Sequence, residues 1–150
     1  MKTRIILCGA CGKMGGNVLS LLADDSEATV VCGVDLFPKE IGIPVYQNFA
    51  NIQEDVDVII DFSSPKSLDG ILEFIKGKNI GAVLCSTGYN EEDIAKIAAR
   101  IRGAKAYFLQ NFVDSGNLIG EGLSPVSDEN MIRMRLRAQE VVPNAAIRGE

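Results

Sequence analysis

Three glycines near the amino terminus have the spacing of a turn that binds phosphate. Gly9, Gly12 and Gly15 form a G-x-x-G-x-x-G pattern that directly follows the apolar run at residues 5–8. Because glycine has no Cβ, it permits a tight turn and a close approach of backbone N–H groups to an anion. A helix starting there would add unpaired N–H groups and the positive end of its dipole. The spacing differs from the commoner G-x-G-x-x-G, yet strand, glycine turn and helix in this order predict a pyrophosphate site.

An acidic residue follows at the distance that a dinucleotide site requires. Residues 18–22 supply an apolar face at helical spacing, and the β-branched strand predicted at residues 28–34 ends at Asp35. In a Rossmann unit, an acidic residue about 20 positions beyond the glycines accepts hydrogen bonds from the adenosine ribose. Asp35 lies 20 positions after Gly15, as this role requires. The alternative is that Asp35 is solvated and only opens a loop.

Composition restricts the class of protein. The chain has 150 residues, 47% of them hydrophobic, which suits one good core. Its net charge of −5 and the lack of a Lys/Arg cluster argue against a nucleic-acid partner. We expect a cytoplasmic protein without a membrane partner, because no apolar run has membrane-spanning length and no signal-peptide pattern is evident. Cys8 and Cys11 have C-x-x-C spacing, but without a second such pair or any histidine we expect no metal site.

The middle of the chain alternates strands with helices. This alternation predicts an α/β fold, a Rossmann-type doubly wound parallel sheet with helices on both faces. Ligands of such sheets bind beyond the carboxyl ends of the strands, so we expect the turns after five strands to line one edge. The further strands are predicted at residues 56–61, 80–85 and 104–109, a short extended piece at 44–46, and helices at 65–76 and 91–102.

The tail has a different pattern. Residues 131–142 alternate apolar side chains with Arg133, Arg135 and Arg137, and this period of two predicts a half-buried strand with a basic face. A helix capped at Ser127 is the alternative. The basic face could bind an anion or drive homo-oligomerisation through an exposed edge strand, although a solvated face is simpler. We expect residues 143–150 to be poorly ordered, residues 1–119 to form the dinucleotide-binding domain, and residues 120–150 to be a short tail without a full second domain.

Four segments together resemble one enzyme family. The glycine turn, Val-Ile-Ile-Asp-Phe-Ser at 58–63, Cys-Ser-Thr-Gly at 85–88 and Gln-Asn-Phe at 110–112 are similar to the cofactor domain of dihydrodipicolinate reductase, also called 4-hydroxy-tetrahydrodipicolinate reductase. The resemblance covers residues 1 to about 119. It implies an NAD(P)-dependent oxidoreductase of diaminopimelate and lysine biosynthesis that passes hydride from NADH or NADPH to a cyclic, dicarboxylated imine-type substrate.

The resemblance also implies which residues contact the cofactor. Asp35 would favour NAD by repelling the 2′-phosphate of NADP, and Lys39 is a nearby cation that could soften this preference. The implied contacts are Gly9, Cys11, Gly12, Lys13, Met14 and Gly15 at the pyrophosphate, Asp35 at the ribose, Phe62 and Ser63 along the cofactor, and Ser86, Thr87, Gly88, Asn111 and Phe112 at the nicotinamide end.

The sequence departs from the family in two places. Family members continue into a substrate domain with a paired-histidine signature and a lysine ahead of a D-A-P-S-G-T segment, none of which occurs here. The family's N-F-S-x-G-x-N turn reads Asn-Phe-Val-Asp-Ser-Gly-Asn at 111–117, with Asn117 in register. No catalytic residue can therefore be assigned. Two hypotheses stay open: a reductase that is truncated, inactive or completed by another chain, and a non-catalytic NAD(H)-binding module or sensor.

Overall fold

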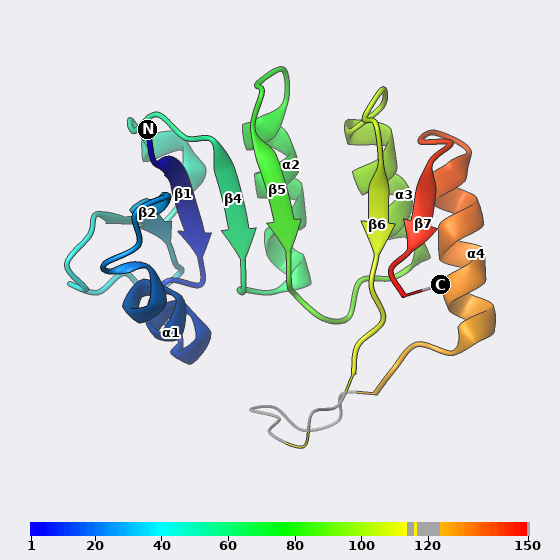
Figure 1. The fold of residues 1–150 in the computed structure, drawn as a ribbon, viewed down its shortest axis with the longest axis horizontal. Coiled ribbons are helices and arrows are strands. Elements are labelled where there is room, and N and C mark those ends of the chain that lie inside the picture. Colours follow the sequence, from blue (N-terminus) through cyan, green and yellow to red (C-terminus); the bar gives the residue numbers. More distant parts are fainter. Residues whose placement is uncertain (114–115, 117–123, 150) are drawn as a thin grey trace. The chain divides into compact units, whose positions relative to one another are not determined.

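The computed structural model describes residues 1–113, 116 and 124–149. The chain forms two compact units, Met1–Ser86 and Thr87–Glu150, each of which is considered by itself (Figure 1). The domain boundary predicted between residues 119 and 120 lies outside the described residues, and so does Asn117.

The first unit contains a five-stranded parallel sheet with the order β3-β2-β1-β4-β5. The chain runs from β1 toward one edge of the sheet and later from β4 toward the other. Right-handed crossovers in opposite directions place the connecting helices on opposite faces, which makes the sheet doubly wound. The elements are β1 (Thr3–Cys8), α1 (Lys13–Leu22), β2 (Ala28–Val34), β3 (Val45–Tyr46), β4 (Val58–Asp61), α2 (Leu68–Ile75) and β5 (Gly81–Leu84), with single 3₁₀ turns at Phe49–Asn51 and Pro65–Ser67.

Strand β1 carries the core of this unit because both of its faces are covered. Ile5 and Leu7 are buried with Val30 of β2 against the apolar face of α1. Side chains alternate along a strand, so Ile6 and Cys8 point to the opposite face, and both are fully buried as well. This burial on two sides explains the continuous apolar run in the sequence. It fixes the carboxyl end of β1, from which the glycine turn starts.

The second unit packs two helices with a short parallel sheet. Its elements are α3 (Glu91–Arg100), β6 (Tyr107–Leu109), α4 (Asp128–Gln139) and β7 (Ala145–Ile147), with β6 parallel to β7. Helix α3 begins with a capping box. The Asn90 side chain accepts a hydrogen bond from the Asp93 backbone N–H, and the Asp93 side chain accepts one from the Asn90 backbone N–H. Among the described helices of both units, none is long and apolar enough to cross a membrane.

The structure confirms the predicted fold class and corrects three details of the second unit. The strand predicted at residues 131–142 is wrong, because Asp128–Gln139 is a helix whose Ser127 cap accepts from the Asn130 N–H. The prediction that residues 143–150 are poorly ordered is wrong for β7, whose pairing with β6 includes an Arg148 N–H bond to the Leu109 carbonyl at 2.7 Å. Strand β6 was expected in the main sheet, but it pairs with β7 in a sheet of two strands.

The change from strand to helix also disperses the predicted basic row. Residues four apart share one face of a helix, so Arg133 and Arg137 lie together while Arg135 lies on another side. The reason for an exposed basic edge strand at 131–142, and hence for oligomerisation through it, no longer applies.

Candidate cofactor site

The glycine turn is shaped by close contacts that exclude side chains. Gly9 has a φ of +74°, and a Cβ there would lie 2.9 Å from the carbonyl oxygen of Phe62, after β4. At Gly15 a Cβ would lie 2.5 Å from the carbonyl oxygens of both Gly9 and Ala10. Gly12 closes the turn by donating its N–H to the Gly9 carbonyl at 3.1 Å. Gly9 and Gly15 therefore have steric reasons to be glycine, whereas the extended backbone of Gly12 would also accept other residues.

A fourth glycine, in β2, makes room for the turn from the side. A Cβ at Gly33 would lie 2.5 Å from the Cβ of Ala10, although its other neighbours are at ordinary distances of 3.5 Å or more. Ala10 is itself almost fully buried. The turn is thus packed against the neighbouring strand.

The amino terminus of α1 has the properties of an anion site. Gly12 is the N-cap and supplies no side-chain hydrogen bond, and the first turn contains no acidic residue. Lys13 and Met14 are exposed at this end. The first N–H groups of a helix have no partner within the helix, and its dipole favours negative charge there. These residues fit a pyrophosphate, which would satisfy the N–H groups that no side chain caps.

Asp35 connects the end of β2 to the glycine turn. Its Oδ2 accepts from the Cys11 N–H at 3.0 Å, and its Oδ1 accepts from the Phe37 N–H at 3.0 Å. Each carboxylate oxygen has a second lone pair, so Asp35 can still accept from a ribose hydroxyl. The carboxylate is half-buried, and it lies in the same hydrogen-bonded turn as the expected pyrophosphate site.

The ends of β4 and β5 are joined through a buried carboxylate, that of Asp61. Its Oδ1 accepts from the Ser63 backbone N–H at 3.0 Å and from the Ser63 hydroxyl, and its Oδ2 accepts from the Ser86 hydroxyl at 2.7 Å. Asp61 is completely buried, whereas Ser63 is exposed and Ser86 half-buried. Asp61 therefore holds two predicted cofactor residues that come from different strands.

Two thiols lie near this carboxylate. Burial, followed by the charge of Asp61, raises the pKa of Cys8 and that of Cys85 above the ordinary thiol range. At neutral pH both are therefore thiols rather than thiolates, which is consistent with a packing role for Cys8.

The remaining predicted residues belong to the second unit. Thr87 and Gly88 are exposed and precede α3, and Gly88 has a φ of +93°. Asn111 and Phe112 follow β6 and are half-buried. The Asn111 side chain binds the backbone of Val126 twice, donating to its carbonyl at 2.7 Å and accepting from its N–H at 2.9 Å. In this structure the amide of Asn111 thus holds its own unit together.

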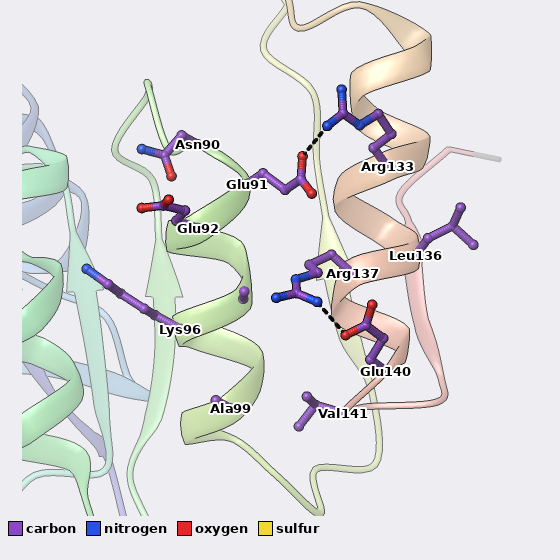
Figure 2. Close-up of a pocket in the computed structure, with 11 residues that line it drawn as sticks. Asn90, Glu91, Glu92, Lys96, Ala99, Arg133, Leu136, Arg137, Glu140 and Val141 are labelled. Carbon is purple, nitrogen blue, oxygen red and sulfur yellow. Dashed lines mark hydrogen bonds and ion pairs between the residues drawn. The ribbon is translucent and has the colours of Figure 1, made fainter.

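An open groove runs between α3 and α4 within the second unit (Figure 2). Arg133 pairs with Glu91 at 3.0 Å and Arg137 pairs with Glu140 at 2.7 Å, so both arginines form ion pairs with acidic residues of the groove itself. The groove includes none of the predicted cofactor residues. Its lining, among the described residues, is Asn90, Glu91, Glu92, Ala95, Lys96, Ala99, Arg133, Leu136, Arg137, Glu140 and Val141.

The structure brings the predicted residues of the first unit to one edge of its sheet. A line of contacts runs from Asp35 to Cys11, from Gly9 to the backbone of Phe62, and from Ser63 through Asp61 to Ser86. Asp61 was not among the predicted cofactor residues, although it belongs to the family-like segment at residues 58–63. Its sequence signal is an acidic residue at the end of a buried strand, with one serine, Ser63, two positions later and a second serine, Ser86, after the next strand.

Comparison with known proteins identifies the family. Residues 3–112 match the family described as dihydrodipicolinate reductase, N-terminus. The 4-hydroxy-tetrahydrodipicolinate reductase of Clostridium novyi is 32% identical over 126 residues, which cover 83% of this chain and 50% of that protein. The enzyme of the same name from Methylococcus capsulatus is 33% identical over 132 residues, covering 79% and 49%. The chain thus spans about half the length of these relatives.

Solved structures show the same fold. A dipicolinate-bound dihydrodipicolinate reductase from Paenisporosarcina sp. TG-14 has a TM-score of 0.53 at 15% identity, covering 95% of this chain and 68% of that one. A myo-inositol 2-dehydrogenase from Lactobacillus plantarum has a TM-score of 0.55 at 15% identity, covering 67% and 33%. Fold, glycine turn and sequence relatives agree, and the chain belongs to the dihydrodipicolinate reductase family through the amino-terminal domain that its residues 3–112 match.

Proposed function

We propose that this chain binds a nicotinamide dinucleotide along the strand-end edge of its first unit, with the pyrophosphate at the start of α1. The observation that carries the proposal is the uncapped amino terminus of α1, framed by glycines at positions where a Cβ would meet carbonyl oxygens. Asp35 would receive the adenosine ribose and favour NAD over NADP through its negative charge. The ends of β4 and β5 would then lie along the nicotinamide half.

We further propose that the bound cofactor serves the reductase reaction of the family. In net terms, the dihydronicotinamide would supply a hydride to the ring of a cyclic, dicarboxylated imine-type substrate, and the 4-hydroxyl group of that substrate would leave as water with one proton from solvent. The residues of this chain would bind and orient the cofactor for that transfer. The four cysteines are unpaired, which supports a reducing, cytoplasmic location.

A second candidate function is cofactor binding without catalysis. The described residues at the strand ends of the first unit are joined by hydrogen bonds that would bind and orient a dinucleotide, which is all that such a function requires. A chain that binds NAD(H) without turnover would act as a cofactor-binding module or sensor.

Substitution of Gly12 separates anion binding from folding. Gly12 has the extended conformation of an N-cap, and Asp and Ser are both favoured caps. Gly12→Asp places a carboxylate where the pyrophosphate is proposed, so we expect the helix to remain stable while NADH binding is lost. Gly12→Ser adds a similar cap without charge and should weaken binding less. Fluorescence titration with NADH measures both, and equal affinities for wild type and Gly12→Asp would contradict the pyrophosphate site.

Turnover is tested separately from binding. NADH oxidation is followed with freshly generated 4-hydroxy-tetrahydrodipicolinate, with the wild-type chain and a no-enzyme control. A rate above the control that Gly12→Asp abolishes supports the reductase. Binding of NADH with a rate equal to the control supports the non-catalytic module.

A further inference from the structure

The hydrogen bonds of Asp61 fix the direction of two hydroxyl protons. A carboxylate has no proton to give, so the Ser63 and Ser86 hydroxyls must each donate to it. The Ser63 oxygen also lies 2.8 Å from that of Ser67. Because the single Ser63 proton is already directed to Asp61, Ser67 is the donor in that contact. Both protons at the strand ends therefore point inward, and the remaining lone pairs of Ser63 and Ser86 are left for other donors.

The carboxyl ends of the strands therefore present hydrogen-bond donors in one place and hydrogen-bond acceptors in another. At the start of α1, backbone N–H groups can only donate, and they suit the oxygens of a phosphate. At the ends of β4 and β5, oxygens offer lone pairs backed by a buried negative charge, and they suit donors such as ribose hydroxyls or a carboxamide NH₂. A dinucleotide carries both kinds of group, and its nicotinamide nucleoside holds the donors.

We propose that Asp61 is a positioning residue that turns the Ser63 and Ser86 hydroxyls into acceptors for the hydrogen-bond donors of the nicotinamide nucleoside. The inference rests on the proposed binding of a nicotinamide dinucleotide at this edge. Asp61 has no contact with the ligand itself in this scheme, because it is completely buried beneath the two serines. It sets which part of the cofactor lies on β4 and β5, and it disfavours a phosphate there.

Replacement of Asp61 by Asn tests the direction of the protons at almost constant shape. The Asn Oδ1 can keep the Ser63 bonds, so its NH₂ group faces Ser86, whose proton must then turn outward. Affinity is measured by calorimetry for ADP, ADP-ribose and NADH. We expect Asp61→Asn to weaken NADH binding by about five- to tenfold, the scale of one hydrogen bond lost at a polar site, and to leave ADP binding within about twofold.

The ligand series also identifies the donor. A loss that appears already with ADP-ribose assigns the donor to the ribose, and a loss seen only with NADH assigns it to the carboxamide. Asp24→Asn removes an exposed carboxylate of the same unit and is expected to match wild type for all three ligands.

Two results would overturn the inference. An equal loss of ADP and NADH affinity would show that Asp61 only maintains the fold, and an unchanged NADH affinity would show that proton direction does not matter. If Asp61→Asn does not fold, Ser86→Ala takes its place, because it deletes one acceptor and keeps the buried charge; unchanged NADH affinity in that variant likewise rejects the scheme. Failure of the wild-type chain to bind NADH would instead reject the proposed function.

Discussion

Adjacent glycines in α1 should respond to the same substitution with opposite signs. Gly15 is buried, and an added Cβ would lie 2.5 Å from two carbonyl oxygens of the turn, which are backbone atoms that cannot rotate away. Gly16 is exposed, and nothing lies within 4 Å of its added Cβ. We therefore expect Gly15→Ala to destabilise the protein by about 1–3 kcal/mol through overpacking. Gly16→Ala should stabilise it by about 0.5–1 kcal/mol, because alanine loses less backbone entropy in a helix.

Thermal unfolding measures the effect of each substitution on stability, and NADH titration measures its effect on cofactor binding. In a unit of this size, 1 kcal/mol corresponds to about 4–8 °C in melting temperature, so the two variants should melt on opposite sides of wild type. To admit the methyl group, Gly15→Ala must open the turn, and NADH binding should weaken with it. Gly16→Ala should bind like wild type. Equal stabilities for the two variants, or tight NADH binding by Gly15→Ala, would refute the close approach of the turn to α1.

Three further changes test other parts of the structure. Asp35→Asn should raise the affinity for NADPH relative to NADH, measured by competitive titration, because it removes the charge that repels a 2′-phosphate; an unchanged ratio would place the ribose elsewhere. Hydrogen bonds from Arg4 lower the pKa of Asp57 from 3.8 to about 2, so this group contributes stability above pH 4 that is lost as the pH falls toward 2. Acid unfolding of Asp57→Asn should lack that contribution, and a pH profile identical to wild type would count against the ion pair. Ser127→Ala should cost about 1 kcal/mol and reduce helicity in circular dichroism, whereas a strand at this position would show no such change.

The sequence predicted the first unit well because its signals are local. The strand at residues 28–34 and the helix start at Gly12 agree with the structure, since β-branched runs and glycine turns act over a few residues. Helix α4 was only the alternative to a predicted strand, because Ile132, Met134 and Leu136 alternate with arginines in the manner of a half-buried strand. In the helix, Met131 and Ala138 are the buried residues, and they are seven positions apart, as a helical face requires. Ser127 followed by two acids was the contrary signal.

The features that the sequence did not predict depend on contacts between segments that are distant along the chain. The role of Asp61 requires that β4 and β5 lie side by side, so that Ser86 reaches a carboxylate 25 residues away. The pairing of β6 with β7 joins two strands of three residues, too short for a periodic pattern. Likewise, the bond from Cys11 to Asp35 follows from the parallel pairing of β1 with β2, not from the spacing alone.

Ala10 and Gly33 border one small volume, so substitutions at these two positions are coupled. A methyl group fits at either position but not at both, since the two Cβ atoms would lie 2.5 Å apart. A lineage that acquires alanine at position 33 must first have lost the methyl group at position 10, because the reverse order passes through a crowded intermediate. The packing of the turn against β2 therefore constrains the order in which mutations around the cofactor site can accumulate.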